Sequence, residues 1–304
     1  MSARLRYDAM AVIVTGAGTG IGAAHARLLA SRGASVLVND LDAPAAEQVA
    51  GEIVAAGGAA AVCTASVATE AGAQAIVDAA IAAFGRIDAV VNNAGVLRSA
   101  PLTELSVDEW STIIGVGLTG PMLVTRAAWP HLVAAGAGRV VMTTSNSGLL
   151  GIPGSSAYAS AKAGLWGLVR VLAIEGEDAG IAVNGLAPMA YTAMSARSKV
   201  APRAWRDGTG DEWSRRLDVD FVAPVAAWLC HPSCPLSGEV LSAAGGRVAR
   251  YFMGLTEGFA SDALTVEEIP ANLAAILDTT GHQVLRRASE EGRNLPRRLI
   301  PHSE

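Results

Sequence analysis

The sequence has few cysteines, no long hydrophobic run and no excess of positive charge, and each absence excludes a class of protein. Three cysteines in 304 residues cannot build a disulfide framework, which fits a reducing compartment. No apolar run approaches a membrane span, and the opening MSARLRYDAM holds no apolar signal region, so we expect a soluble, cytoplasmic protein. The net charge of −5 gives no excess of positive charge that would attract nucleic acid or an anionic membrane, so neither is expected as a partner.

The two cysteines near the end of the predicted sheet flank a histidine, in Cys230-His231-Pro232-Ser233-Cys234. Thiolates and an imidazole this close suggest a metal site, but the sequence contains no second cluster of ligands. Trp228-Leu229-Cys230 is better explained as the buried end of a helix, so we expect no metal.

Short β-branched segments alternate with long amphipathic ones, in a chain that is 51% hydrophobic and 17% charged. The predicted strands are Val12–Thr15, Ser35–Asp40, Ala60–Thr64, Ala89–Asn92, Arg139–Thr144, Ile181–Ala187 and Val240–Ser242. The predicted helices include Ile21–Arg32, Ala43–Ala56, Thr69–Phe84, Val107–Ala135 and Ala157–Glu177. Strands apolar on both faces and separated by helices indicate an α/β fold, a Rossmann-like doubly wound parallel sheet of about seven strands with helices on both faces.

Two segments depart from this alternation. Residues from about 192 to 220 are rich in Arg, Trp, Ser and Gly and have little periodicity, as expected of a mobile lid beside a ligand. We expect the sheet to end by Gly246, so that residues 1–246 form the main domain and 247–304 a C-terminal extension with a helix over Val266–Leu277. The extension would cover an active site or a subunit contact, or be a frayed tail.

The first predicted strand runs into a glycine-rich loop, TGAGTGIG at residues 15–22, and a helix opens directly after it. Such a loop lets the backbone approach a pyrophosphate, whose charge is met by the amides of the helix N-terminus. The second strand ends in Asn39-Asp40, at the distance expected for a carboxylate that binds the adenosine ribose. Because no Arg or Lys lies in the loop or next to Asp40 to offset its charge, the pattern favours NAD over NADP.

A second group of residues is suited to proton transfer. Tyr158 and Lys162 are four residues apart on a predicted helix and share one face. A cation about 4 Å away at an effective dielectric near 20 favours a phenolate by up to ~4 kcal/mol, which would bring the tyrosine pKa toward neutrality. Ser145 closes the preceding strand, where its hydroxyl can hold a substrate oxygen.

Taken together, these motifs resemble those of the short-chain dehydrogenase/reductase family. TGAGTGIG, NNAG at 92–95, Ser145, YASAK at 158–162 and VNGLAP at 183–188 occur in the family's order, and the resemblance covers about residues 10–246. It implies an NAD-binding dehydrogenase domain in which Ser145 binds the substrate oxygen and Tyr158 is the acid/base. Lys162 would hold the nicotinamide ribose and lower the pKa of the tyrosine.

The resemblance also implies the residues around the cofactor, among which Asn93 mainly supports the sheet and Thr192 binds the carboxamide. The full set is Gly16, Gly18, Thr19, Gly20, Ile21, Gly22, Asp40, Ser66, Val67, Asn93, Ala94, Gly95, Tyr158, Lys162, Pro188 and Thr192. A homodimer or homotetramer, packed through the helices around 107–135 and 157–177, is implied as well.

A narrower resemblance concerns the substrate. FGRIDAVVNNAGVLRS at 84–99, TRAAWPH at 125–131 and PVAAWLCHPSCPLSGEV at 224–240 are similar to the (3R)-hydroxyacyl-CoA dehydrogenase region of peroxisomal multifunctional enzyme type 2 and its bacterial relatives. Ser66-Val67 would take the place beside the adenine. The resemblance implies a 3-hydroxyacyl-CoA as the first substrate candidate, and a hydroxysteroid or another bulky secondary alcohol as the second.

The stretch IIGVGLTGP at 113–121 carries Gly115 and Gly117 inside a helical pattern, where each glycine costs about 1 kcal/mol. In most of the family an asparagine that helps a proton relay aligns with Gly117. We expect a kinked helix, an altered relay and a space that one or two waters fill. The alternative from another functional class is a nucleotide-binding scaffold that has lost catalysis.

Overall fold

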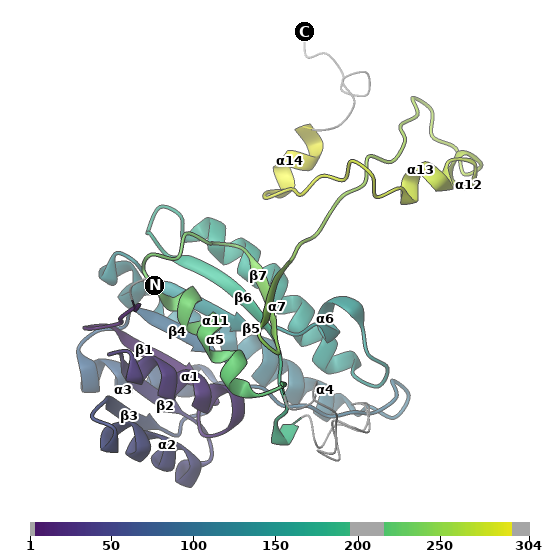
Figure 1. Cartoon of the computed structure of the whole chain (residues 1–304). Coiled ribbons are helices and arrows are strands. Elements are labelled where there is room, and N and C mark those ends of the chain that lie inside the picture. Colours follow the sequence, from purple (N-terminus) through teal and green to yellow (C-terminus); the bar gives the residue numbers. More distant parts are fainter. Residues whose placement is uncertain (1–3, 195–215, 294–304) are drawn as a thin grey trace. The chain divides into compact units, whose positions relative to one another are not determined.

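The computed structural model describes residues 4–194 and 216–293, so most of the predicted lid at about 192–220 lies outside the described residues. The chain divides into two units, Met1–Arg250 and Tyr251–Glu304. The strands of the sheet are β1 Ala11–Thr15, β2 Ser35–Asn39, β3 Ala59–Cys63, β4 Ala89–Asn92, β5 Arg139–Thr143, β6 Ala182–Met189, β7 Val240–Ala244 and β8 Arg247–Tyr251. Their spatial order is β3-β2-β1-β4-β5-β6-β7-β8, and β1 to β7 pair in parallel (Figure 1), so the expected doubly wound α/β fold is confirmed.

Helices cover both faces of this sheet because the strands are apolar on both sides (Figure 1). On one face lie α1 Gly20–Ser31, α2 Ala43–Ala55 and α11 Ala223–Cys230, and on the other α3 Glu70–Phe84, α5 Gly120–Ala135 and α7 Ser156–Glu175. Consecutive residues of a strand alternate between the two cores: Val12 and Val14 of β1 pack against the first set, and Ile13 against the second.

The sheet contains one strand more than the sequence predicts. β8 follows β7 after Gly245 and Gly246, which both have a positive φ, of 57° and 87°, so the two strands form a tight hairpin. An ion pair between Arg250 and Glu239, with Nε 2.6 Å from Oε2, joins the ends of the hairpin. The expectation that the sheet ends by Gly246 is therefore wrong, and the two adjacent glycines were the missed signal.

The long segment predicted as one helix over Val107–Ala135 is divided in three. A capping box between Ser106 and Glu109 starts α4 Val107–Ile114, a π-helical turn η1 follows at Gly115–Thr119, and α5 continues from Gly120. The irregularity expected at the two glycines is thus a π turn, which is a common way to bend a helix near a functional site.

The second unit does not contain the continuous helix predicted over Val266–Leu277. It has two short helices, α12 Glu268–Ala271 and α13 Leu273–Leu277, followed by α14 Ala288–Arg293. Pro270 removes an amide donor, and the Asn272 side chain donates to the Glu268 carbonyl at 2.8 Å in competition with the backbone. These two residues explain the break.

Cys230 and Cys234 are buried, and burial raises the pKa of the Cys230 thiol to about 12. His231 Nδ1 accepts from the Ser233 amide at 3.1 Å and so closes a local turn. Among the described residues, no group of three or more His, Cys, Asp or Glu side chains could hold a metal ion. None of the described helices is long and apolar enough to cross a membrane.

His25 on α1 is completely buried, and within the described residues neither of its ring nitrogens has a hydrogen-bond partner. Burial lowers its pKa from the ordinary value of 6.5 to about 3, because the charged ring cannot be solvated there. The unfolded chain binds a proton at this residue below pH 6.5 while the folded chain stays neutral down to about pH 3, so acid destabilises the fold over this interval.

We therefore predict that His25 lowers the free energy of unfolding by about 2 kcal/mol when the pH falls from about 7.5 to about 5. Urea unfolding at the two pH values should show this loss in the wild type and a smaller loss in His25→Leu. His131→Gln, at a partly exposed histidine, is the control and should retain the wild-type pH dependence. An identical pH dependence in His25→Leu and the wild type would contradict the prediction.

Candidate active site

The site lies where the strand order reverses between β1 and β4, so the loops that leave these strands diverge and open a crevice. Asn93 joins the two loops. Its side-chain amide donates to the carbonyl oxygens of Thr15 at 3.1 Å and Gly16 at 3.0 Å. The Thr15 hydroxyl accepts from the Asn93 and Ala94 amides in return, at 3.0 and 3.1 Å. The structural role expected of Asn93 fits these contacts.

The glycine-rich loop connects β1 to α1, and its backbone adopts a conformation and a close packing that leave no room for a side chain at Gly16 or Gly22. Gly16 has a φ of +63°, and a Cβ on Gly22 would lie 2.1 Å from the Gly16 carbonyl oxygen. Within the described residues the N-cap residue of α1, Thr19, does not cap the helix with its side chain. The amides of the first turn therefore face the crevice as donors for an anion.

Asp40 follows β2 and is held by two backbone amides. Its Oδ2 accepts from the Gly18 amide at 2.9 Å, and its Oδ1 accepts from the Asp42 amide at 3.1 Å. These contacts fix the carboxylate at the edge of the glycine loop, with lone pairs left for a further donor.

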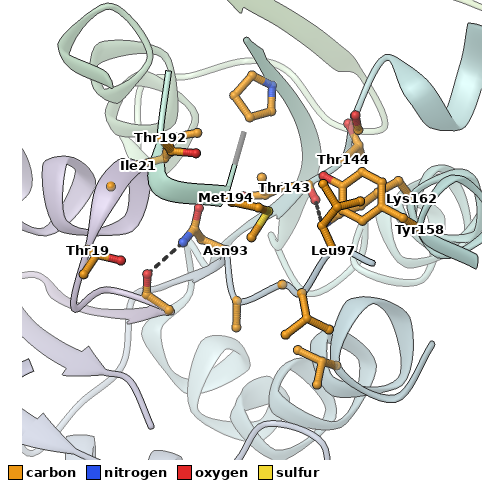
Figure 2. A pocket seen from close by; sticks show the side chains of 18 of the residues that line it. Thr19, Ile21, Asn93, Leu97, Thr143, Thr144, Tyr158, Lys162, Thr192 and Met194 are labelled. Carbon is orange, nitrogen blue, oxygen red and sulfur yellow. Dashed lines mark hydrogen bonds between the residues drawn. The ribbon is translucent and has the colours of Figure 1, made fainter. Parts of the chain in front are cut away.

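A cavity of about 670 Å³ occupies the crevice (Figure 2). Of the residues predicted for the site, it is lined by Gly16, Thr19, Gly20, Ile21, Asp40, Ser66, Val67, Asn93, Ala94, Gly95, Ser145, Tyr158, Lys162, Pro188 and Thr192. Gly18 and Gly22 do not line it: the first bonds Asp40, and the second packs against Gly16. In Figure 2, Thr19, Ile21 and Thr192 lie at one end of the cavity, and Tyr158 and Lys162 lie at the other.

Several lining residues were not predicted from the sequence. Apolar side chains come from loops and element ends without a periodic pattern: Val96, Leu97, Ile152, Met189 and Met194. Asn39, Thr143, Thr144 and Ser147 add polar groups, and the hydroxyls of Thr143 and Thr144 are buried without a partner in the described part of the chain. The serine pattern around Ser145 was the available signal for Ser147, whereas the apolar set had none.

Helix α7 carries Tyr158 and Lys162 on one face, as their spacing predicts. The Lys162 ammonium is buried, donates to the Thr143 carbonyl at 2.6 Å and lies 5.7 Å from the centre of the Tyr158 ring. Burial lowers the pKa of Lys162 to about 8, so the group is close to losing its charge near neutral pH.

The pKa of Tyr158 is raised, because desolvation penalises the phenolate, and the neighbouring Ser145 hydroxyl acts in the opposite direction. This differs from the expectation from the sequence, in which the lysine charge lowers the tyrosine pKa toward neutrality. The difference arises because burial penalises the phenolate, while the Lys162 ammonium is directed to the Thr143 carbonyl.

Comparison with known proteins now bears on this site. The model of the short chain dehydrogenase family matches residues 10–203, well over half of the chain. This chain belongs to the short-chain dehydrogenase/reductase family. It is therefore an oxidoreductase that acts on CH–OH groups, and the family uses a nicotinamide nucleotide, NAD or NADP.

Among family members, a short-chain type dehydrogenase/reductase of Mycobacterium tuberculosis is 39% identical over 90% of this chain and 96% of its own length. Peroxisomal multifunctional enzyme type 2 of Mus musculus is 40% identical over 82% of this chain, which matches 34% of that enzyme. The full-length structure of the Drosophila melanogaster enzyme has a TM-score of 0.80 and 31% identity, covering 97% of this chain and 50% of that one. This chain thus spans half or less of both multifunctional enzymes, and the expected resemblance to this branch is confirmed.

Gly117 of η1 faces helix α7, which carries Tyr158 and Lys162. A Cβ at Gly117 would lie 3.2 Å from the Cβ of Ala161, closer than ordinary contact. Ala161 thus limits the space on this side of Gly117, and the water-filled space expected at this position stays a prediction. Gly115 differs, since a Cβ there would meet no described heavy atom within 4 Å.

We predict that Gly117→Ala lowers the free energy of unfolding by about 1 kcal/mol through overpacking, despite the better helix propensity of alanine. Gly115→Ala is the matched control and should raise it by up to ~1 kcal/mol. In an Ala161→Gly background the cost of Gly117→Ala should disappear, which urea unfolding would measure. Equal stabilisation by both glycine replacements would contradict the close contact.

Proposed function

We propose that this chain is an NAD-dependent dehydrogenase that interconverts a secondary alcohol and a ketone, with a 3-hydroxyacyl-CoA as the first substrate candidate. The observation that carries the proposal is one cavity lined by Ser145, Tyr158 and Lys162 together with Asp40 and the glycine loop, with Tyr158 and Lys162 at the opposite end from Thr19 (Figure 2). The alternative of a scaffold without catalysis gains no support from these three residues, which are all present in the cavity.

The cavity residues fit a dinucleotide. The first-turn amides of α1 offer donors to a pyrophosphate, and the Asp40 carboxylate offers acceptors to ribose hydroxyls. Lys162 is the one cation among the described residues that line the cavity, and Figure 2 shows it at the end away from Thr19, whose neighbour Gly18 donates its amide to Asp40. A 2′-phosphate would therefore meet the carboxylate without a compensating charge, which supports NAD.

The reaction needs a group that moves a proton and a group that holds the substrate oxygen. When bound, the nicotinamide supplies the acceptor or donor of the hydride. In alcohol oxidation the Tyr158 phenolate takes the hydroxyl proton, and in ketone reduction its phenol returns it. Ser145 donates a hydrogen bond to the same oxygen. Lys162 would hold the nicotinamide ribose, and its charge would favour the phenolate.

Two features support an acyl or similarly apolar substrate. Leu97, Ile152 and Met194 line the cavity, and apolar walls suit an acyl chain. The branch that the sequence resembles oxidises 3-hydroxyacyl thioesters. The same walls would suit a hydroxysteroid, which is the second candidate.

We also propose a homodimer or homotetramer that packs through α4, α5 and α7. An apolar groove of about 400 Å³ lies between η1, α5 and α7, and Leu118, Met122, Leu168 and Val171 contribute to it. Val171 is 51% exposed on α7, and an added Cβ at Gly167 would meet nothing within 4 Å, which leaves space for close approach of a partner helix.

The test of the function is NADH formation with a 3-hydroxyacyl-CoA and, separately, with a hydroxysteroid. We predict that Tyr158→Phe lowers kcat by about a thousandfold, because the proton carrier is lost, while NAD binding is retained. NAD affinity is measured by calorimetry on the same variant. An unchanged rate in Tyr158→Phe would contradict the mechanism, and no turnover of either alcohol would rule out both substrate candidates.

The choice of NAD has its own prediction. Asp40→Asn keeps the shape but removes the charge, so the preference for NAD over NADP in kcat/KM should fall about tenfold or more. Asp42→Asn is the matched control: Asp42 caps α2 by accepting from the Ala45 amide, and its change should leave the preference unaltered. An equal fall in both variants would assign the effect to local structure rather than to the Asp40 charge.

A further inference from the structure

The hydroxyl of Ser145 is already engaged inside the protein, by a residue without a role so far. The Ser147 amide donates to Ser145 Oγ at 3.2 Å, and the Oγ atoms of the two serines are 2.8 Å apart. Both side chains are buried, at 8% and 3% exposure. Among the described residues, the Ser147 hydroxyl has its hydrogen bond with Ser145, and a longer contact of 3.4 Å joins Ser145 Oγ to Asn146 Oδ1.

A serine hydroxyl has one hydrogen and two lone pairs, so the direction of the bond between the two serines decides what Ser145 offers to the cavity. If Ser147 donates, its amide and hydroxyl occupy both lone pairs of Ser145, and the Ser145 hydrogen remains for the cavity. The long contact to Asn146 holds this hydrogen only weakly. If Ser145 donated to Ser147 instead, the cavity would meet a lone pair.

The reaction requires the first arrangement. A ketone oxygen and a developing alkoxide are both acceptors, so a side chain that stabilises them must donate. We propose that Ser147 is a positioning residue that donates its hydroxyl hydrogen to Ser145 and thereby keeps Ser145 a donor to the substrate oxygen. This inference rests on the proposed function of the same site.

The local structure fixes Ser147 relative to the reacting side chains. Ser147 is the first residue of α6 Ser147–Leu150, and the next residue, Gly148, is pressed against α7. A Cβ at Gly148 would lie 2.7 Å from the Ala163 amide nitrogen and 2.9 Å from the Lys162 carbonyl carbon. Gly148 thus packs against the turn of α7 that carries Lys162. Because Ser147 precedes Gly148 directly, this contact fixes the position of the serine pair.

The test compares Ser147→Ala with the wild type in alcohol oxidation. We predict a fall in kcat of about tenfold, as expected for the loss of one orienting hydrogen bond, with KM for the alcohol and NAD affinity within about twofold. In a Ser145→Ala background, Ser147→Ala should cause no further loss, because Ser147 acts through Ser145. Ser147→Thr, which restores the hydroxyl, should recover most of the rate.

A matched control separates this role from the loss of any buried hydroxyl. Thr125 accepts from the Asn92 side-chain amide at 2.9 Å away from the cavity, so Thr125→Val should lower stability and leave kcat unchanged. A kcat of Ser147→Ala within twofold of the wild type would overturn the proposal. An equal loss in the Ser145→Ala background, or in Thr125→Val, would also overturn it.

A second readout does not depend on turnover. Because the Ser145 hydroxyl counteracts the raised pKa of Tyr158, that pKa should rise further in Ser147→Ala. It is followed by phenolate absorbance, as the difference from Tyr158→Phe. If the wild type oxidises no alcohol, the proposed function fails, while an unchanged Tyr158 titration in Ser147→Ala would independently refute the role of Ser147.

Discussion

Both faces of the seven parallel strands must be covered, because their side chains are apolar on either side. This constraint places helices on both faces of the sheet, and the parallel strands all run in the same direction. The loops that leave the strands therefore gather at one edge. The cavity exists because the order of these loops reverses between β1 and β4, where their divergence leaves a space that side chains do not fill.

The chemistry at this edge depends on how few groups there carry charge. Asp40 and Lys162 are the charged residues among the described residues that line the cavity, and the other lining groups are neutral donors, acceptors and apolar side chains. Burial lowers the pKa of Lys162 and raises that of Tyr158, so each group carries a charge less favourably than it would in water. Proton transfer is therefore coupled to what occupies the cavity, since a ligand changes both the solvation and the partners of these two groups.

Local patterns were enough to predict the fold, the glycine loop and the shared face of Tyr158 and Lys162, because each rests on short-range spacing. Features that depend on distant contacts were missed. The pKa of Tyr158 is shifted by burial and by the Ser145 hydroxyl, and the apolar walls come from loops without periodicity. β8 is not predicted for another reason, because two adjacent glycines are typical both of the end of a sheet and of the hairpin turn that they form here.

The hydrogen bonds between Thr15 and Asn93 connect residues 78 positions apart, so they also bear on how the chain folds. The glycine loop is made early in the sequence, but its carbonyl oxygens find their partner only after β4 has paired with β1 across that separation. Closing so long a loop is slow compared with forming a helix. A chain ending before Asn93 would therefore have the glycine motif without the hydrogen bonds that hold its backbone in place.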